Sequence, residues 1–99
     1  MSTKPLTLVV IFQARPGKET ELRKVLTALV APSRKDAGCL NYDLHASLDE
    51  PGKFIFHENW QSKSHHEAHV ATPHIQALLP RIEELCVAPP QIMMCQRID

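Results

Sequence analysis

The hydrophobic pattern of the first forty residues predicts one strand followed by one helix. Residues 6–12 (LTLVVIF) are apolar apart from Thr7 and rich in β-branched side chains, which is typical of a strand buried on both faces. After Arg15-Pro16-Gly17, apolar residues recur at the spacing of one helix face, at Leu22, Val25, Leu26, Leu29 and Val30. We expect Pro32 to bend or end this helix and Gly38 to stop it.

The next twenty residues alternate between apolar and polar, which predicts a β-hairpin. Apolar positions point one way from the first strand: Leu40, Tyr42, Leu44, Ala46 and Leu48. Asp49-Glu50-Pro51-Gly52 forms the turn, and residues 54–60 form the returning strand. One face of the returning strand carries Phe54, Phe56, Glu58 and Trp60, and the other carries Ile55, His57 and Asn59.

The rest of the chain predicts two helices and a last strand. Ser62 is placed to cap a short helix over residues 63–71, and Thr72-Pro73 supplies the N-cap and first residue of the next helix. The apolar stripe of that helix is Ile75, Leu78, Leu79, Ile82, Leu85 and Cys86. Pro80 predicts a kink, and residues 91–98 predict a strand.

The element order β-α-β-β-α-α-β predicts an α+β, ferredoxin-like fold with an antiparallel sheet and helices on one face. With 99 residues, the chain fits a single domain, residues 1–99, whose core spans about residues 6–98. The first and last strands are apolar on both faces, but the helices cover only one. We therefore expect a homodimer that forms through the uncovered sheet faces.

The amino-acid composition indicates which partners and which cellular compartment to expect. The 11 basic and 11 acidic residues balance, so nucleic acid is not an expected partner. The N-terminal apolar run is too short for a signal or a membrane span, so no membrane partner is expected. Cys39, Cys86 and Cys95 form no pairing motif. These features predict a cytoplasmic protein with reduced thiols.

Residues 65–69 (HHEAH) and His74 are the main candidates for chemistry. Val70 stands where the zinc-protease motif H-E-x-x-H needs its second histidine, so that motif is absent. His65 and His69 have the spacing to share a metal, but the third ligand would have to come from elsewhere, and no metal is predicted. We expect His65 and His66 on a solvated helix face. His69 and His74 are expected near the end of the third strand, where His74 is either a base or a structural hydrogen-bond partner that ties the helix junction to the sheet.

Several of these residues together resemble the antibiotic biosynthesis monooxygenase family, in particular its small quinol monooxygenase-like members. The similarity lies in Glu58-Asn59-Trp60, Ser62, His69 and Thr72-Pro73-His74, with Arg15-Pro16-Gly17 and Gly38-Cys39 as further matches. It extends over about residues 6–98. The resemblance implies a dimeric α/β barrel and oxygenation without metal, flavin or other cofactor.

The chemistry implied by the resemblance needs a base and a dry, apolar pocket for a small aromatic substrate and oxygen. The implied catalytic residues are His74, His69, Asn59 and Trp60. The implied substrate-binding residues are Tyr42, Phe54, Phe56, His57, Glu58 and Leu78. Structural roles remain open for Glu58, as a partner of a basic residue or helix end, and for Trp60, as core. Because neighbouring residues of a strand face opposite ways, these groups cannot all line one cavity.

Two alternatives remain. The chain departs from haem-degrading relatives, since its first strand has no Asn and His69 stands where they have a Trp, so haem degradation is disfavoured. A second enzyme class is an isomerase or other acid/base enzyme on a small phosphorylated carbonyl metabolite, with Arg34, Lys35 and Arg81 as candidate cations. The other alternative is a ligand-binding dimer that keeps the fold without the chemistry.

Overall fold

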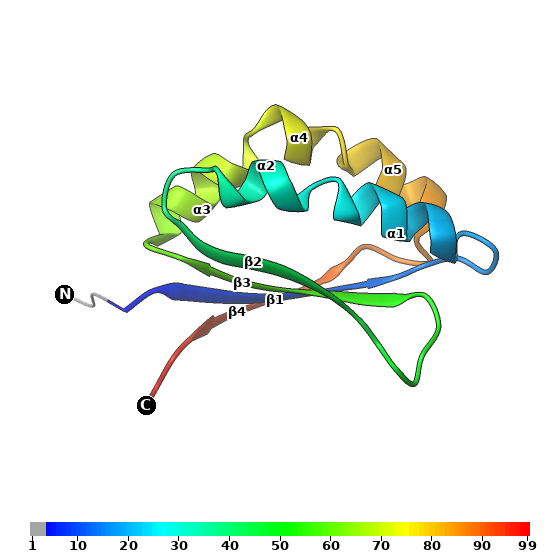
Figure 1. Cartoon of the computed structure of the whole chain (residues 1–99), viewed down its shortest axis with the longest axis horizontal. Helices are drawn as coiled ribbons and strands as arrows, with labels where there is room; N and C mark the ends of the chain where they lie inside the picture. Colours follow the sequence, from blue (N-terminus) through cyan, green and yellow to red (C-terminus); the bar gives the residue numbers. More distant parts are fainter. Residues whose placement is uncertain (1–3) are drawn as a thin grey trace.

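The computed structural model describes residues 4–99 as a four-stranded antiparallel sheet with helices on one face (Figure 1). The strands, in the sheet order β2-β3-β1-β4, are β1 (Leu6–Gln13), β2 (Cys39–Ala46), β3 (Lys53–Trp60) and β4 (Gln91–Gln96). β1 pairs with both β3 and β4, and β2 pairs with β3 as a hairpin. The α+β, ferredoxin-like fold expected from the element order is confirmed.

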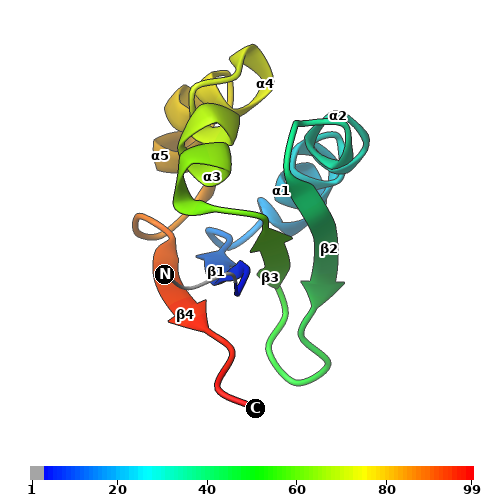
Figure 2. The same cartoon turned by 90° about the vertical axis from the view of Figure 1, so that its left-hand side faces the viewer.

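The helices form two groups above this sheet, as Figure 2 shows. Before the hairpin come α1 (Glu19–Thr27) and α2 (Val30–Arg34), and after it come α3 (Lys63–Val70), α4 (Pro73–Gln76) and α5 (Leu79–Leu85). Among the described residues, none of these helices has the length and apolarity needed to span a membrane.

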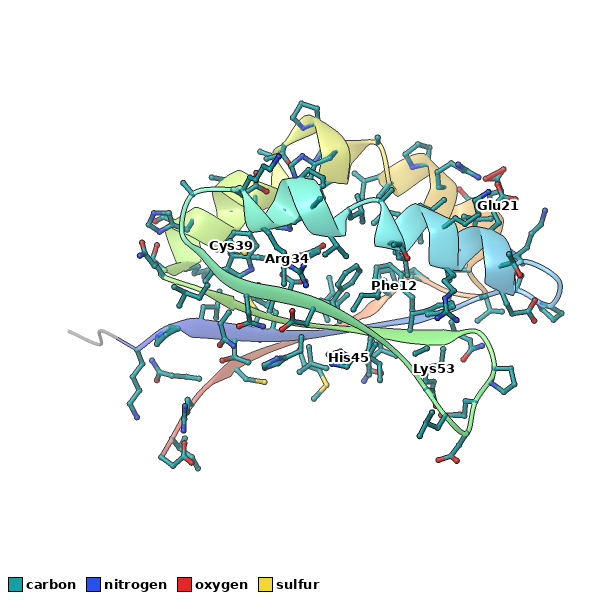
Figure 3. All side chains as sticks on the ribbon, viewed as in Figure 1. Phe12, Glu21, Arg34, Cys39, His45 and Lys53 are labelled. Atoms are coloured by element: carbon teal, nitrogen blue, oxygen red, sulfur yellow. The ribbon has the colours of Figure 1, made fainter. Side chains whose placement is uncertain are left out.

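The core lies between the helices and the sheet, because strand side chains alternate between the two faces. Leu8, Val10 and Phe12 of β1 face the helices, and Figure 3 shows Phe12 on that side and His45 on the other. From β3 the predicted set Phe54, Phe56, Glu58 and Trp60 is buried there. Leu22, Leu26 and Leu85 close the core from the helices.

Both predicted long helices are interrupted, and the proline in each lies just after the break rather than at it. The first helix ends at Thr27, and Pro32 is the third residue of α2. The second breaks after Gln76, and Pro80 is the second residue of α5. A proline is tolerated in a first turn, where backbone N–H groups have no helical partner. The prolines therefore begin new helices instead of kinking old ones.

Leu40 and Leu48 depart from the face predicted for the first hairpin strand. The register of β2 against β3 shifts between Cys39 and Asn41, so Leu40 has no partner residue and is 51% exposed. A bulge of this kind turns one residue out of the alternation. Cys39 packs against the core in its place, and Leu48 lies in the exposed turn.

Candidate functional site

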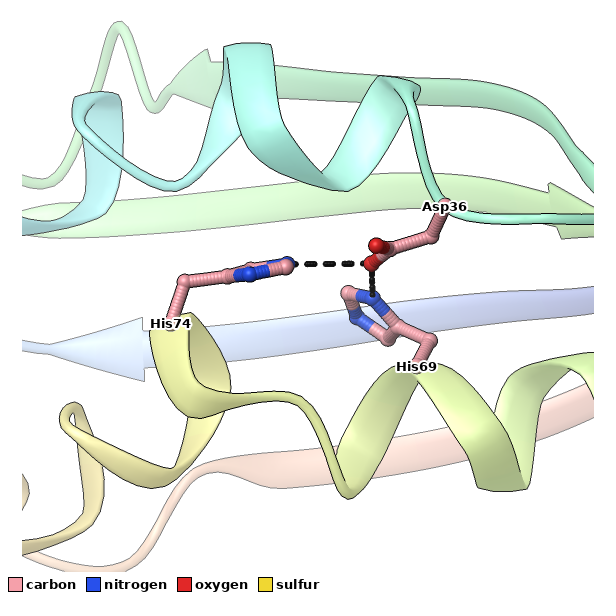
Figure 4. A group of neighbouring side chains, drawn as sticks. All are labelled: Asp36, His69 and His74. Carbon is pink, nitrogen blue, oxygen red and sulfur yellow. Dashed lines mark hydrogen bonds and ion pairs between the residues drawn. The ribbon is translucent and has the colours of Figure 1, made fainter.

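Asp36, His69 and His74 come together at one end of the helical layer (Figure 4). Asp36 lies in the connection from α2 to β2, His69 on α3 and His74 on α4. Asp36 Oδ2 is 2.8 Å from His69 Nδ1 and 3.0 Å from His74 Nε2. The side chain of His69 is only 4% exposed, whereas those of Asp36 and His74 are 16% and 23% exposed. The cluster thus reaches from the core to the surface.

The shared carboxylate indicates where the imidazole protons lie. An ionised carboxylate only accepts hydrogen bonds, so neutral His69 donates from Nδ1 and neutral His74 donates from Nε2. Thr72 fits this arrangement, because its hydroxyl donates to the His69 carbonyl at 2.7 Å and its oxygen lies 3.2 Å from His74 Nε2. The lone pairs are then on His69 Nε2 and His74 Nδ1, which have no hydrogen-bond partner among residues 4–99. His74 is therefore a partly exposed imidazole that a carboxylate holds in one orientation.

Local sequence explains how the two histidines are held. Ser62 caps α3 as predicted, since its hydroxyl accepts a hydrogen bond from the His65 backbone N–H at 3.2 Å. Thr72 occupies the predicted N-cap position of α4, and Pro73 follows it. The Thr72 side chain does not cap that helix, however, because its hydroxyl is used by His69. Thr72 thereby links the end of α3 to the start of α4.

Aromatic side chains of the sheet pack against His69. The ring centroids of Trp60 and His69 are 4.4 Å apart, and those of Tyr42 and His69 are 5.3 Å apart. Tyr42 also packs on Phe56 at 4.7 Å. The Trp60 indole N–H donates to Glu58 Oε1 at 2.9 Å, so Glu58 is bonded to an indole rather than to a basic residue.

Burial shifts the protonation equilibria of these groups. Loss of solvation raises the pKa of Glu58 to about 7, and the hydrogen bond from Trp60 opposes this rise. Burial and the nearby Glu58 charge raise the pKa of Tyr42 above its usual value. Burial lowers the pKa of His69, against the opposing effect of Asp36. As a result, His69 favours its neutral form, and Glu58 titrates near neutral pH.

The remaining predicted site residues divide between the two faces of the sheet. Phe54, Phe56 and Leu78 are core residues on the helix side, together with Tyr42, Glu58 and Trp60. His57 and Asn59 lie on the opposite face, where the Asn59 amide donates to Asn41 Oδ1 at 2.7 Å. Two candidates, His57 and Asn59, are thus separated from the histidine cluster by the sheet itself.

Aromatic side chains pack against one another between the sheet and the helices. Trp60, Phe56 and Tyr42 are almost completely buried, and each contacts another aromatic ring. A pocket of about 530 Å³ lies on the outer sheet face, beside Thr7, Leu40, Asn41, His57, Asn59 and Cys95. Of the three residues in the cluster, His74 is the most accessible from the surface.

His65 and His66 differ from the predicted solvated face, since both are half-buried. The His65 Nδ1 atom lies 2.7 Å from Ser62 Oγ, and its ring packs directly against Gly38. The His66 ring lies 6.1 Å from that of Trp60, and burial lowers its pKa. His65 and His69, whose spacing would allow them to share a metal, have different partners instead, Ser62 for His65 and Asp36 for His69.

Asp36 was not predicted as a site residue, although the pairing of the two hairpin strands indicates that it lies beside α3. Cys39 pairs with Trp60, so the residues just before Cys39 lie beside those that follow Trp60. An acidic residue three positions before the hairpin is thereby brought to α3, 33 residues ahead of His69. Two of the three candidate phosphate cations are paired with acidic residues outside the cluster: Arg34 with Asp43, and Arg81 with Glu21 and Glu84.

Comparison with known proteins identifies the family. The profile of the antibiotic biosynthesis monooxygenase family matches residues 5–81. "Putative monooxygenase Rv0793" of Mycobacterium tuberculosis is 29% identical over 97 residues, which cover 98% of this chain and 95% of that protein. "Putative monooxygenase YcnE" of Bacillus subtilis is 29% identical over 84 residues, covering 85% and 88% of the two chains.

A solved structure agrees with the sequence relatives. The crystal structure of PA3566 from Pseudomonas aeruginosa is similar over 100% of this chain and 99% of that one, with a TM-score of 0.94 and 35% identity. The fold, the matched profile and the full-length relatives agree with the resemblance carried by the Glu58–Trp60 and Thr72–His74 segments. The chain belongs to the antibiotic biosynthesis monooxygenase family.

Proposed function

We propose that the protein is a cofactor-independent monooxygenase that oxidises a phenol or hydroquinone to a quinone with molecular oxygen. The observation that carries the proposal is the shared Asp36 carboxylate, which orients two imidazoles in a chain of the monooxygenase family. His74 is the proposed base, because it is the more exposed of the two histidines. Asp36 and His69 hold it in place.

In this mechanism, His74 Nδ1 takes the proton of the substrate hydroxyl, and Asp36 stabilises the resulting imidazolium. A phenol has a pKa near 10, so a neutral imidazole assists its ionisation at neutral pH. The phenolate passes one electron to oxygen, and the two radicals combine into a peroxide on a ring carbon. Cleavage of the O–O bond leaves one oxygen atom on that carbon as a quinone carbonyl and releases the other as water.

The test is oxygen uptake by chelator-treated protein with a panel of hydroquinones, measured against autoxidation. Loss of a positioned base typically costs a factor of 10² to 10⁴, so we expect His74→Ala to lower uptake about 100-fold or more. His45→Ala is the matched control, since His45 is exposed on the outer face of β2. If no hydroquinone is consumed above background, or if His74→Ala is as active as wild type, the proposal is wrong.

We further propose that the active form is a homodimer that packs sheet face against sheet face. Apolar side chains lie on the face away from the helices, including Val9 and Ile11 of β1 and Ile55 of β3. Met93 of β4, which pairs with Val9, is exposed on the same face. An exposed apolar area of this kind is typical of an interface.

The close aromatic packing between sheet and helices favours a second candidate function, a ligand-binding dimer without catalysis. Such a protein would bind an aromatic ligand at the His74 surface without consuming oxygen. The oxygen measurement separates the two candidates directly. Saturable binding of a hydroquinone with uptake at the autoxidation rate would favour the second.

A further inference from the structure

The cluster of Asp36, His69 and His74 also has the composition of a metal site. Their ligand atoms, one carboxylate oxygen and two imidazole nitrogens, all lie within 4.8 Å of one another. Among residues 4–99 this is the one such group of three potential ligands. Two histidines and one carboxylate form a donor set that suits first-row transition metals.

The two distances from Asp36 to the histidines are close to those between ligand atoms of a coordination sphere. With bonds of about 2.1 Å, adjacent ligand atoms lie about 3.0 Å apart at right angles and about 3.4 Å apart in a tetrahedron. The two observed distances to Asp36 Oδ2 are 2.8 and 3.0 Å. Small rotations of the side chains would therefore place an ion where the two imidazole protons now bridge to the carboxylate.

Burial favours such a site and leaves it open to solvent on one side. His69 is fixed at the base against the Trp60 ring, 4.4 Å away. Asp36 and His74 are partly exposed, so an ion can enter and keep water as its remaining ligand. The three residues come from three separate segments that the fold already holds together.

We propose that this cluster binds one divalent transition-metal ion, such as Zn²⁺, through Asp36 Oδ2, His69 Nδ1 and His74 Nε2. Mg²⁺ and Ca²⁺ are excluded by the two nitrogen ligands, since these ions prefer oxygen. The ion competes with the protons on the two imidazoles, because a nitrogen must be unprotonated to bind a metal.

The same site then regulates the proposed oxygenation, and this part of the inference rests on the proposed function. A neutral imidazole has one N–H group and one lone pair. When an ion takes the lone pair of His74 at Nε2, the proton must move to Nδ1, the nitrogen proposed as the base. Zn²⁺ therefore inhibits the oxygenase by switching the His74 tautomer.

The first experiment measures binding and requires no activity. Zn²⁺ is titrated into tag-free, chelator-treated protein by calorimetry at pH 7.5, with Mg²⁺ as the comparison ion. We expect one Zn²⁺ per chain, binding at least 10-fold weaker in His74→Ala and in Asp36→Asn, and wild-type binding in His45→Ala. Circular dichroism confirms that each variant is folded. Affinity should also fall at pH 5.5, where protons compete.

Two outcomes of the titration would contradict the proposed metal site. The metal site is wrong if Zn²⁺ binds no better than Mg²⁺, or if stoichiometric binding persists in both His74→Ala and Asp36→Asn. Oxygen uptake is measured separately, with and without one equivalent of Zn²⁺. Unchanged or increased uptake in the Zn²⁺-loaded protein overturns the inhibition, and no uptake in the metal-free protein overturns the proposed function, while the binding result stands by itself.

Discussion

The indole N–H of Trp60 donates a hydrogen bond to Glu58, with 2.9 Å between Nε1 and Oε1, inside the core. Both residues lie on the helix-facing side of β3, two positions apart. The bond offsets only part of the cost of burying a carboxylate, since burial raises the pKa of Glu58 to about 7. Glu58 is thus a titratable group hydrogen-bonded to Trp60, whose ring packs against His69.

This pair predicts how Glu58→Gln changes stability with pH. The folded-state pKa is raised above the ordinary value of 4.5, so the contribution of Glu58 is fully present below about pH 4.5 and is lost as pH rises to 7. Gln keeps an acceptor for Trp60 and cannot ionise. We expect the variant to match wild type near pH 4.5 and to exceed it by about 1 to 3 kcal/mol at pH 8.

The measurement is urea unfolding of both proteins between pH 4.5 and 8. The difference between the two proteins is the relevant quantity, because burial lowers the pKa of His69 and so makes protein stability fall as pH drops below 6.5. That effect is common to both proteins and cancels. A difference in unfolding free energy that is independent of pH would contradict the prediction.

The hydrogen bond between Asp36 and His69 predicts how the pKa of His69 changes when Asp36 is replaced. Its carboxylate raises the pKa of His69 against the effect of burial. In Asp36→Asn this opposing effect is lost, so the pKa of His69 should fall further and the ring should stay neutral to lower pH. Losing two hydrogen bonds to a charged acceptor should also cost about 1 to 3 kcal/mol of stability.

The His69 titration can be followed by NMR of the ring nitrogens in both proteins. His45, on the far side of the sheet, provides an internal reference. An unchanged His69 titration curve in Asp36→Asn would show that the carboxylate does not act on this ring.

The contact between Gly38 and His65 predicts that substitutions at the two positions change the free energy of unfolding non-additively. Gly38 has a φ of 81°, and a Cβ atom there would lie 2.2 to 2.6 Å from three atoms of the His65 side chain. Gly38→Ala should cost about 1 to 2 kcal/mol from backbone strain, with a further cost from this collision. In a His65→Gly background, which removes all three of these atoms, only the strain at position 38 remains. Unfolding of the four proteins of the cycle should give a coupling energy of about 1 kcal/mol or more, and strict additivity would rule out the contact.

The sequence predicts the sheet and the inner face of β3 because both depend on local alternation. Phe54, Phe56, Glu58 and Trp60 share one face through their spacing alone. The exposed Leu40 was not predictable in this way, since a bulge depends on pairing with β3. For the helix breaks after Thr27 and Gln76, the prolines gave only the approximate positions.

The candidate site was predictable only in part, for a similar reason. His69 and His74 are close in sequence and stood out as a histidine-rich segment, but Asp36 joins them over 33 and 38 residues. No local pattern marks Asp36 as different from other acidic residues. Its partners become evident only when the hairpin places the residues before Cys39 beside those after Trp60.

The outer sheet face supplies the last prediction. Met93 pairs with Val9 and shares its side of the sheet, away from the helices, and it is 45% exposed in the single chain. A charge at this position costs the monomer little, because the side chain is already exposed, but it would be buried without a partner between two sheet faces. Met93→Glu should therefore dissociate the proposed dimer and leave the fold intact.

Leu79→Glu is the matched control, since Leu79 is 51% exposed on α5, in the helical layer on the other side of the sheet. Light scattering after gel filtration should give wild type and Leu79→Glu twice the 11.2 kDa of one chain, and Met93→Glu a mass near 11.2 kDa. A monomeric wild type at all protein concentrations would disprove the dimer. If Leu79→Glu dissociated while Met93→Glu did not, the interface would have to lie on the helical side instead.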